Sequence, residues 1–299
     1  MTVNITPLTP GFAGEVGPID LRKVRDRETL EAIRAGMDKY AVLVFRDQDF
    51  TNDEQLDFAQ RFDGTLHART SSAAISGNRF GNEALADVSN VGADGKIRSA
   101  DDRKRASAVA NRLWHTDASF VDPPGRYSML SARVVPPVRA DTEFADMRAA
   151  YDALDEETKA LVQDMVCEHS QMYSRQVIGF TDFTDEERER FRPVRQCMVR
   201  THPVTGRKSL YLSSHAGEIV GWPMPEARGF LRDLIEHATQ REFVYTHKWR
   251  LGDLVMWDNR QTMHRARPFP AHEPRDMRRT TLMGDAPTAR QVDTRVAAE

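Results

Sequence analysis

The sequence of 299 residues is poor in cysteine and has no long apolar run. Cys167 and Cys197 are the only cysteines, which is too few for a disulfide framework, and they lack the spacing of a metal-binding motif. No stretch approaches the roughly 20 apolar residues that a membrane-spanning helix needs. The N-terminus also lacks the basic start and apolar segment of a signal peptide. These absences predict a cytoplasmic protein without a membrane partner.

The sequence also lacks an excess of charge of either sign. Its net charge is −3, and acidic and basic residues are mixed along the chain. A nucleic-acid-binding domain usually carries a clustered basic surface, so we expect no nucleic-acid partner. Hydrophobic residues make up 40% of the chain, which is enough for one substantial core. All-β domains often exceed ~200 residues, so we expect a single domain over residues 1–299, and the sequence is compatible with a homo-oligomer.

Local patterns predict a chain made mainly of strands, with helices inserted between them. Apolar or alternating runs predict strands over 41–45, 127–135, 243–249, 254–257 and 275–283, and a hairpin from 198–202 to 208–213. Helical spacing predicts helices over 30–40, 146–154, 156–165 and 226–239, and a capping box at 51–54 begins another. Because regular βαβ alternation is missing, we expect a β-sandwich or jelly roll with helical insertions.

Two segments have little periodic pattern. Residues 63–111 are polar, rich in Gly, Ser and Asn, and aperiodic except for a short strand expected at 87–91. A loop of this length in a compact domain is more often a lid or binding segment than an idle connection. We therefore expect 63–111 to be a lid or active-site loop. The tail over 285–299 is charged and rich in Ala, which predicts a flexible end.

The most informative motif is His115-Thr116-Asp117, followed far along the chain by His264. Two imidazoles and one carboxylate are the ligand set of a mononuclear Fe(II) site, which leaves three positions open for O2 and other ligands. Residues i and i+2 of a strand point to the same side, so the side chains of His115 and Asp117 can meet one metal. The alternative is ordinary, because a His-x-Asp or a lone histidine is often a structural group bonded to a nearby acid.

An arginine-rich strand strengthens the metal interpretation. Arg275 and Arg279 are four residues apart, so they share a strand face with Cα atoms ~13 Å apart at about 3.3 Å per residue. They can therefore bind two different anions, and Arg is well suited to a bidentate hold on carboxylate. A solvated edge strand is the alternative. The pattern favours a pocket for 2-oxoglutarate and an acidic substrate beside Fe(II).

Five stretches carry a resemblance to a known family: LWHTDASF (113–120), RYSMLSARVVPP (126–137), DTEFADMRAAYDAL (141–154), EHATQREFVYTHKWRLGDLVMWDNR (236–260) and MHRARPF (263–269). Together they resemble the taurine dioxygenase/2,4-dichlorophenoxyacetate dioxygenase family of Fe(II)/2-oxoglutarate enzymes. The resemblance is closer to the herbicide-degrading aryloxyalkanoate branch than to the taurine enzyme. It runs from the region of Leu8 to about Leu282, nearly the whole chain.

This resemblance implies a double-stranded β-helix, a distorted jelly roll with flanking helices, in which Fe(II) binds 2-oxoglutarate and O2. It implies that the iron ligands are His115, Asp117 and His264. Arg275 and Thr142 match the family's residues for the C5 carboxylate of 2-oxoglutarate, and Arg279 matches the arginine for the substrate's anionic group. His202 and His215 match histidines linked with the substrate pocket. For these two, a structural role in or near the hairpin is the alternative.

The implied reaction is hydroxylation of the ether-adjacent carbon of an aryloxyacetate herbicide, which releases a phenol and glyoxylate together with succinate and CO2. A 2-aryloxypropionate, a sulfonate or an alkyl sulfate is an alternative substrate for the same chemistry. A zinc hydrolase and a ligand-binding jelly roll without activity are alternatives of other classes. The sequence departs from the family at Arg139-Ala140, where the family has Gly-Gly, and around residues 62–64.

Overall fold

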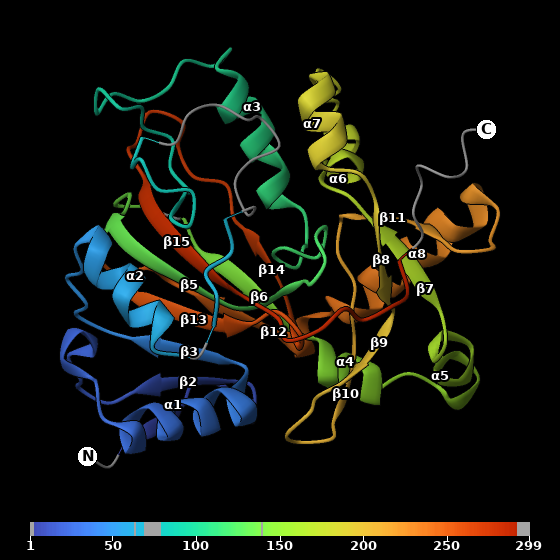
Figure 1. Cartoon of the computed structure of the whole chain (residues 1–299), viewed down its shortest axis with the longest axis horizontal. Coiled ribbons are helices and arrows are strands. Elements are labelled where there is room, and N and C mark those ends of the chain that lie inside the picture. Colours follow the sequence, from blue (N-terminus) through green and yellow to red (C-terminus); the bar gives the residue numbers. More distant parts are fainter. Residues whose placement is uncertain (1–2, 63, 69–78, 139, 292–299) are drawn as a thin grey trace.

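The computed structural model describes residues 3–62, 64–68, 79–138 and 140–291. Its largest sheet has seven strands in the order β1-β2-β3-β13-β5-β15-β4, antiparallel except for the β2–β3 pair (Figure 1). The strands span β1 Ile5–Pro7, β2 Ala13–Val16, β3 Val42–Phe45, β13 Leu254–Asp258, β5 Gly125–Val134, β15 Asp276–Met283 and β4 Ala86–Asp87. Apolar runs form the central strands, since β3 and β13 are buried along their whole length.

A second sheet packs against this one and completes the jelly roll. It contains β12 (Val244–His247), β6 (Thr142–Asp146) and β14 (Thr262–Ala266), all antiparallel. Phe144 of β6 points into the core, where its ring centroid lies 5.4 Å from that of Trp257 on the large sheet. The fold is therefore the expected distorted jelly roll with flanking helices.

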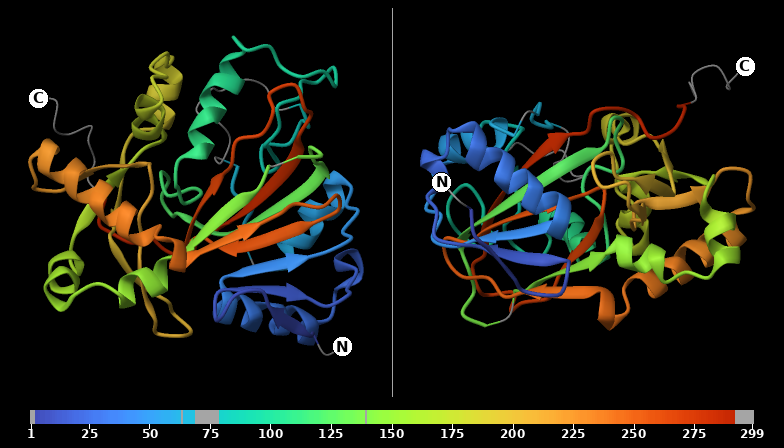
Figure 2. Two further views of the ribbon diagram at one scale, coloured as in Figure 1. Left: turned by 180° about the vertical axis from the view of Figure 1, so that it is seen from behind. Right: turned by 90° about the horizontal axis from the view of Figure 1, so that it is seen from below.

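Helices near the N-terminus cover the outer face of the large sheet (Figure 2). They are α1 (Arg27–Tyr40), α2 (Asn52–Gln60) and the short η1 (Leu21–Lys23). Ile33 and Met37 of α1 are fully buried in the same cluster as Leu43 and Met256 of the sheet. The capping box predicted from the sequence is present, because Thr51 and Glu54 each accept a hydrogen bond from the other's backbone N–H.

The remaining elements form a second layer beside the jelly roll (Figures 1 and 2). Its strands are β7 (Val166–His169), β8 (Val194–Cys197) and β11 (Ala216–Ile219), with the hairpin β9 (Val199–Thr201) and β10 (Lys208–Leu210). Its helical elements are α4 Met147–Asp152, α5 Glu156–Val162, α6 Gln171–Val177, α7 Asp185–Arg190, α8 Met224–Ala238 and η3 Arg241–Phe243. The amphipathic α8 buries Leu231 and Leu234 against this layer.

Most expected strands and helices are present within a few residues of their predicted bounds, but two segments differ. The segment 63–111 contains α3 (Arg103–Ala108) and η2 (Val109–Arg112), which the sequence did not predict, and its strand is only the two-residue β4. Positions 63 and 69–78 of that segment lie outside the described residues, as does 292–299 of the tail. The described part of the tail is held against β8, because the side chains of Thr288 and Gln291 both bond to it. No helix in the described part of the chain is both long and apolar enough to cross a membrane.

Candidate active site

His115, Asp117 and His264 converge into one buried cluster. His115 Nε2 lies 3.9 Å from Asp117 Oδ1, and His264 Nε2 lies 3.8 Å from Asp117 Oδ2. All three ligand atoms lie within 4.8 Å of one another. Metal bonds to nitrogen and oxygen are about 2.0–2.2 Å long, so one ion between these atoms can reach all three. The geometry therefore suits a mononuclear metal ion.

The local structure at this cluster differs in part from the expected strand. His115 and His264 of β14 form an isolated antiparallel bridge, in which each backbone N–H donates to the other's carbonyl. Asp117, however, begins a turn, and Ala118 after it has a φ of 52°. An alanine pays a steric penalty in this left-handed region. The two side chains meet because the chain turns after the bridge, and the expectation of a continuous strand was wrong.

A hydrogen-bonded chain behind Asp117 fixes its carboxylate. Asn259 Oδ1 accepts from the backbone N–H of Asp117 (3.2 Å) and from Trp257 Nε1 (3.0 Å), so its amide nitrogen must face Ser128. That nitrogen donates to Ser128 Oγ (2.9 Å), and the Ser128 hydroxyl donates to Asp117 Oδ2 (2.9 Å). Partners of this kind orient metal ligands.

The protonation states also suit a metal. Burial lowers the pKa of His115 and lowers that of His264 well below its ordinary value. Burial raises the pKa of Asp117, but the positive charge of Arg279 and the hydrogen bond from Ser128 lower it by more, so the net shift is downward. His115 Nδ1 lies 2.8 Å from the Leu113 carbonyl, to which it donates, and Nε2 is left with its lone pair. Neutral imidazoles and an ionised carboxylate are the forms that bind metal.

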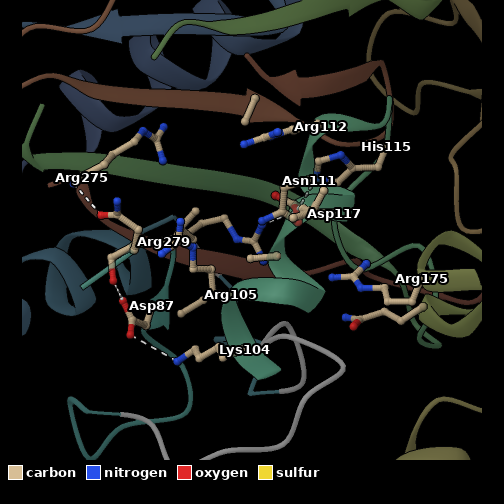
Figure 3. A pocket seen from close by; sticks show the side chains of 18 of the residues that line it. Asp87, Lys104, Arg105, Asn111, Arg112, His115, Asp117, Arg175, Arg275 and Arg279 are labelled. Carbon is tan, nitrogen blue, oxygen red and sulfur yellow. Dashed lines mark hydrogen bonds and ion pairs between the residues drawn. The ribbon is translucent and has the colours of Figure 1, made fainter. Parts of the chain in front are cut away.

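A cavity of about 410 Å³ opens beside the cluster and is lined by His115 and Asp117 (Figure 3). Much of its wall comes from the segment 81–112, which includes part of the expected lid. Phe120, Ala108 and Val109 supply apolar wall. The cavity can therefore hold organic ligands next to the metal position.

Arg275 and Arg279 both line this cavity but have different surroundings. Arg275 is 6% exposed, and its guanidinium lies 5.8 Å from the centroid of the Phe269 ring. It has no carboxylate partner in the described part of the chain, and burial lowers its pKa to about 10. Arg279 instead pairs with Asp117 through Nη1 and Oδ1. A buried guanidinium without an acid is an anion-binding group, so Arg275 fits a carboxylate ligand.

Thr142 and His215 have definite places near the cavity. Thr142 begins β6 beside the cavity residue Ala266, but Thr142 itself does not line the cavity, and its hydroxyl accepts from Trp249 Nε1 (2.9 Å). Two residues earlier, Ala140 has a φ of 152°, a value that favours glycine. Ala140 stands at one of the two positions where the family has Gly-Gly. His215 lines the cavity, and its Nδ1 lies 2.9 Å from Ser174 Oγ.

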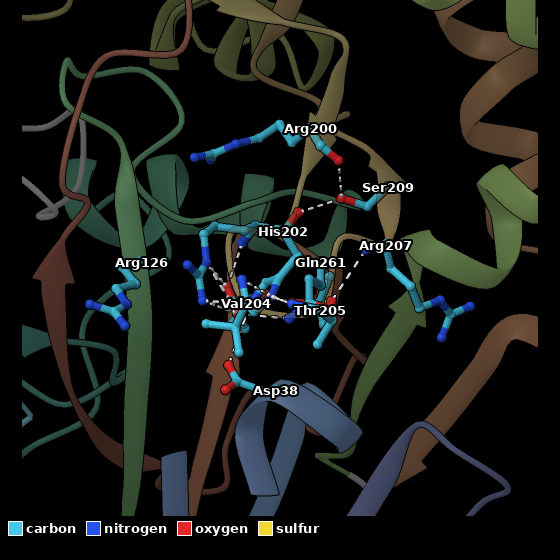
Figure 4. A network of polar contacts seen from close by, with 12 residues as sticks. Asp38, Arg126, Arg200, His202, Val204, Thr205, Arg207, Ser209 and Gln261 are labelled. Atoms are coloured by element: carbon cyan, nitrogen blue, oxygen red, sulfur yellow. Dashed lines mark hydrogen bonds and ion pairs between the residues drawn. The ribbon is translucent and has the colours of Figure 1, made fainter. Parts of the chain in front are cut away.

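His202 lies away from this cavity, so its expected place in the substrate pocket was wrong. Its Nε2 lies 2.8 Å from Arg260 Nη2 and 3.5 Å from Asp258 Oδ2, and the backbone N–H of Thr205 donates to Nδ1 (Figure 4). It lines a separate cavity of about 240 Å³. The alternative role of a structural histidine at the hairpin accounts for these contacts.

Three residues at the site were not predicted from the sequence. Ser128 in β5 and Asn259 just after β13 are fully buried polar residues, and a polar residue in or next to an apolar run was their only signal. Arg175 of α6 lines the cavity and is 4% exposed. No local pattern distinguishes Arg175 from the many surface arginines of the chain.

Comparisons with known proteins agree with this geometry. Residues 4–281 match the family described as taurine catabolism dioxygenase TauD, TfdA. The chain is 46% identical to an alpha-ketoglutarate-dependent 2,4-dichlorophenoxyacetate dioxygenase of Cupriavidus pinatubonensis, over 96% of this chain and 99% of that protein. It is 36% identical to an (S)-phenoxypropionate/alpha-ketoglutarate-dioxygenase of Delftia acidovorans, over 95% of this chain and 96% of that protein.

Among solved structures, the chain is similar to AAD-2 in complex with Mn(II) and N-oxalylglycine. The TM-score is 0.89 and the sequence identity is 54%, over 97% of this chain and 100% of AAD-2. A putative alpha-ketoglutarate-dependent 2,4-D dioxygenase from Burkholderia xenovorans has a TM-score of 0.80 at 40% identity, over 95% of this chain and 98% of that one.

Proposed function

Because the chain belongs to the taurine catabolism dioxygenase TauD, TfdA family, it is an Fe(II)- and 2-oxoglutarate-dependent dioxygenase, and we propose that it hydroxylates the ether-adjacent carbon of an aryloxyacetate. The observation that carries the proposal is the buried cluster of His115, Asp117 and His264 beside a cavity lined by Arg275 and Arg279. The relatives that act on 2,4-dichlorophenoxyacetate support the choice of substrate.

The chain's own residues hold the reactants. Neutral His115 and His264 and ionised Asp117 bind Fe(II), and the buried Arg275 binds the C5 carboxylate of 2-oxoglutarate. Thr142 lies behind the cavity wall, next to the lining residue Ala266, and its hydroxyl accepts from Trp249 Nε1, so its proton remains to be donated to that carboxylate when 2-oxoglutarate binds. Bound Fe(II) couples the decarboxylation of 2-oxoglutarate by O2 to the hydroxylation of a substrate C–H bond.

The cavity suits a substrate that is a small anion with an aromatic ring. Arg279 contacts Asp117, so a carboxylate held by Arg279 lies next to the metal position. Phe120 and Val109 offer apolar wall to the aryl ring. Precise placement of the C–H bond is a large part of the rate advantage of such an enzyme. His215, which lines the cavity, contributes a ring nitrogen or apolar contact to the same substrate.

The aryloxyacetate, 2-oxoglutarate and O2 give the hydroxylated ether, succinate and CO2, with one oxygen atom in each of the hydroxyl group and succinate. The hydroxylated ether is a hemiacetal. Its C–O bond to the aryl oxygen breaks, the hydroxyl proton passes to that oxygen, and a phenol and glyoxylate are released.

Two substrate classes compete with an aryloxyacetate within the same chemistry. A 2-aryloxypropionate has support from the relative of Delftia acidovorans at 36% identity. A sulfonate or alkyl sulfate has less, since the alpha-ketoglutarate-dependent sulfate ester dioxygenase of Pseudomonas putida is 28% identical. Because the chain belongs to a dioxygenase family, the zinc hydrolase and the inactive binding protein are no longer alternatives.

A product assay tests the proposal directly. We expect purified enzyme with Fe(II), 2-oxoglutarate and O2 to release phenol and succinate in equal amounts from 2,4-dichlorophenoxyacetate. His115→Ala and His264→Ala should release neither, because two protein ligands hold the metal weakly. A panel with an (S)- and an (R)-2-phenoxypropionate, a sulfonate and an alkyl sulfate ranks the alternatives. Succinate formation with one of these and none with any aryloxyacetate would overturn the substrate assignment.

A further inference from the structure

Arg175 is a buried cation on the wall of the active-site cavity. It comes from α6 and is 4% exposed. Its Nη1 donates to Ser174 Oγ (2.9 Å), and its Nε lies 3.4 Å from Ser107 Oγ. In the described part of the chain no carboxylate pairs with it, and its Nη2 makes no hydrogen bond. Arg175 thus presents an unneutralised guanidinium edge to the cavity.

Ser174 holds this guanidinium in one orientation. The Ser174 hydroxyl donates its single proton to the carbonyl of Gln171 (2.9 Å), so it can only accept from Arg175 and from His215 Nδ1. One serine therefore fixes both side chains, and both line the cavity. A guanidinium that is already oriented loses little entropy when it binds an anion.

Contacts place Arg175 at the metal end of the cavity, where Arg279 also lies. Ser174 bonds both Arg175 and His215, the His215 ring centroid lies 5.8 Å from that of His115, and Arg279 pairs with Asp117. Burial and the positive charge of Arg279 lower the pKa of Arg175 to about 10. For Arg275, burial is the only cause of the downward pKa shift. Figure 3 shows Arg175 and Arg275 reaching into the cavity from opposite sides of Asp117. One end of the cavity therefore has Arg275, and the other has two arginines that repel each other.

We propose that the carboxylate of the prime substrate binds between Arg175 and Arg279, so that Arg175 is a second substrate-binding residue. This inference rests on the proposed function. Arg279 already pairs with Asp117, whereas the buried Arg175 has no carboxylate partner among the described residues. A buried guanidinium is unfavourable without an anion, and a substrate carboxylate can accept from both guanidinium groups at once. The Phe120 ring contacts the His215 ring edge-on, with centroids 4.9 Å apart and an interplanar angle of 83°, and provides apolar surface for the aryl group beside the carboxylate.

Equilibrium binding to the enzyme loaded with Mn(II) and 2-oxoglutarate tests this assignment without turnover. The probes are 2,4-dichlorophenoxyacetate and its neutral amide, measured by titration calorimetry. The wild type should bind the acid much more tightly than the amide. Arg175→Gln should reduce that preference at least tenfold, because it weakens binding of the acid and not of the amide. Arg175→Lys should be intermediate, because it keeps the positive charge but loses the planar guanidinium that can donate two parallel hydrogen bonds. Arg188→Gln removes one charge from the exposed face of the neighbouring α7 and should leave the preference unchanged.

Each other outcome has a definite meaning. Equal weakening of acid and amide by Arg175→Gln would overturn the inference, because a purely structural role has that effect. A raised Kd for 2-oxoglutarate with an unchanged acid preference would also overturn it and assign Arg175 to the cosubstrate. If the wild type releases phenol but binds acid and amide alike, the inference fails and the proposed function stands. If the wild type neither binds aryloxyacetates nor releases phenol, both fail.

Discussion

Ser128 orients the carboxylate of Asp117, to which its hydroxyl donates a hydrogen bond. Its hydroxyl donates to Asp117 because an ionised carboxylate can only accept, while Asn259 donates to the hydroxyl oxygen. Loss of such a partner typically lowers metal affinity ~10–100-fold. We therefore expect Ser128→Ala to weaken Fe(II) binding by about tenfold or more, measured by titration of apoenzyme with the metal under anaerobic conditions.

Ser131 provides the matched control for this substitution. It is fully buried on the same strand, and its hydroxyl has no hydrogen-bond partner within the described residues. Ser131→Ala should leave metal affinity unchanged. If both variants lose affinity equally, the loss comes from damage to β5 and not from the bond to Asp117.

Arg275 allows a second prediction at the scale of one residue. A charged hydrogen bond is worth ~1.5–3 kcal/mol, or roughly ten- to a hundredfold in binding. Arg275→Gln should therefore raise the KM for 2-oxoglutarate by about that factor, while the Kd for aryloxyacetate changes little. An unchanged KM for 2-oxoglutarate would show that another residue holds the C5 carboxylate.

Thr142 needs a more careful pair of variants. Its hydroxyl accepts from Trp249, which is buried, so Thr142→Val removes a structural hydrogen bond as well as a ligand contact. Thr142→Ser keeps the hydroxyl. We expect the valine variant to raise the KM for 2-oxoglutarate less than Arg275→Gln does, and the serine variant to resemble the wild type.

At the scale of elements, local pattern predicted most of the jelly roll. Continuous apolar runs predicted β3 and β13, and the capping box at Thr51 predicted the start of α2. These signals are local, since burial and capping depend on residues a few positions apart. The hairpin β9–β10 was predicted for the same reason, with its turn residues between two strand-like runs.

The elements that shape the site were harder to predict because they depend on contacts between distant segments. His115 is held by one bridge to His264, and Asp117 is aimed by a turn at Ala118 whose positive φ has no sequence signal. His202 matched a family histidine, yet it bonds to Arg260 outside the active-site cavity. A motif fixes residue identity, but the cavity to which a side chain belongs depends on tertiary packing.

Asp87 anchors the segment over the cavity to the large sheet. Its side chain, 1% exposed, contacts Arg79 (3.2 Å), Arg98 (3.5 Å) and Lys104 (3.2 Å), while β4 pairs with β15. Burial raises the pKa of Asp87, but the Ser89 hydrogen bond and the charges of Lys104 and Arg79 lower it by more, so the net shift is downward. The charged form therefore stabilises the fold above the unfolded-state pKa, and this stabilisation is lost as the pH falls through the lower folded-state pKa.

We accordingly expect Asp87→Asn to destabilise this segment. Removing one partner of a buried ion pair costs up to ~3–5 kcal/mol, and the partial exposure of the three cations reduces that cost. The variant should melt at a lower temperature at neutral pH and be cleaved faster within 79–112 by a protease. The difference from the wild type should shrink as the pH falls below about 4, near the ordinary Asp pKa. Asp94→Asn, an exposed change in the same segment, should behave like the wild type, and equal effects of both would contradict the anchoring role.

At the scale of the whole molecule, the cavity wall has an excess of positive charge, although the chain as a whole has a net negative charge. The chain has a net charge of −3. The cavity wall has eight cationic side chains and three carboxylates. The cations are Lys104, Arg105, Arg112, Arg175, Arg190, Arg267, Arg275 and Arg279. A concave surface of one sign concentrates ligands of the other sign and speeds their association. The fold thus gathers positive charge from distant segments at the place where two anions must enter.

This arrangement predicts that salt slows the association of the anionic ligands with the enzyme and leaves the rate of the chemical step unchanged. The Debye length falls from ~30 Å at 0.01 M to ~3 Å at 1 M salt, so the attraction over the cavity mouth is screened. We expect kcat/KM for both 2-oxoglutarate and aryloxyacetate to fall several-fold over that range, with kcat nearly constant. The inhibition constant of the neutral aryloxyacetamide, measured at saturating 2-oxoglutarate, should stay the same because no net charge draws it in. If the amide weakens as much as the acid, salt acts on the fold or the metal, and the electrostatic role of the cavity is refuted.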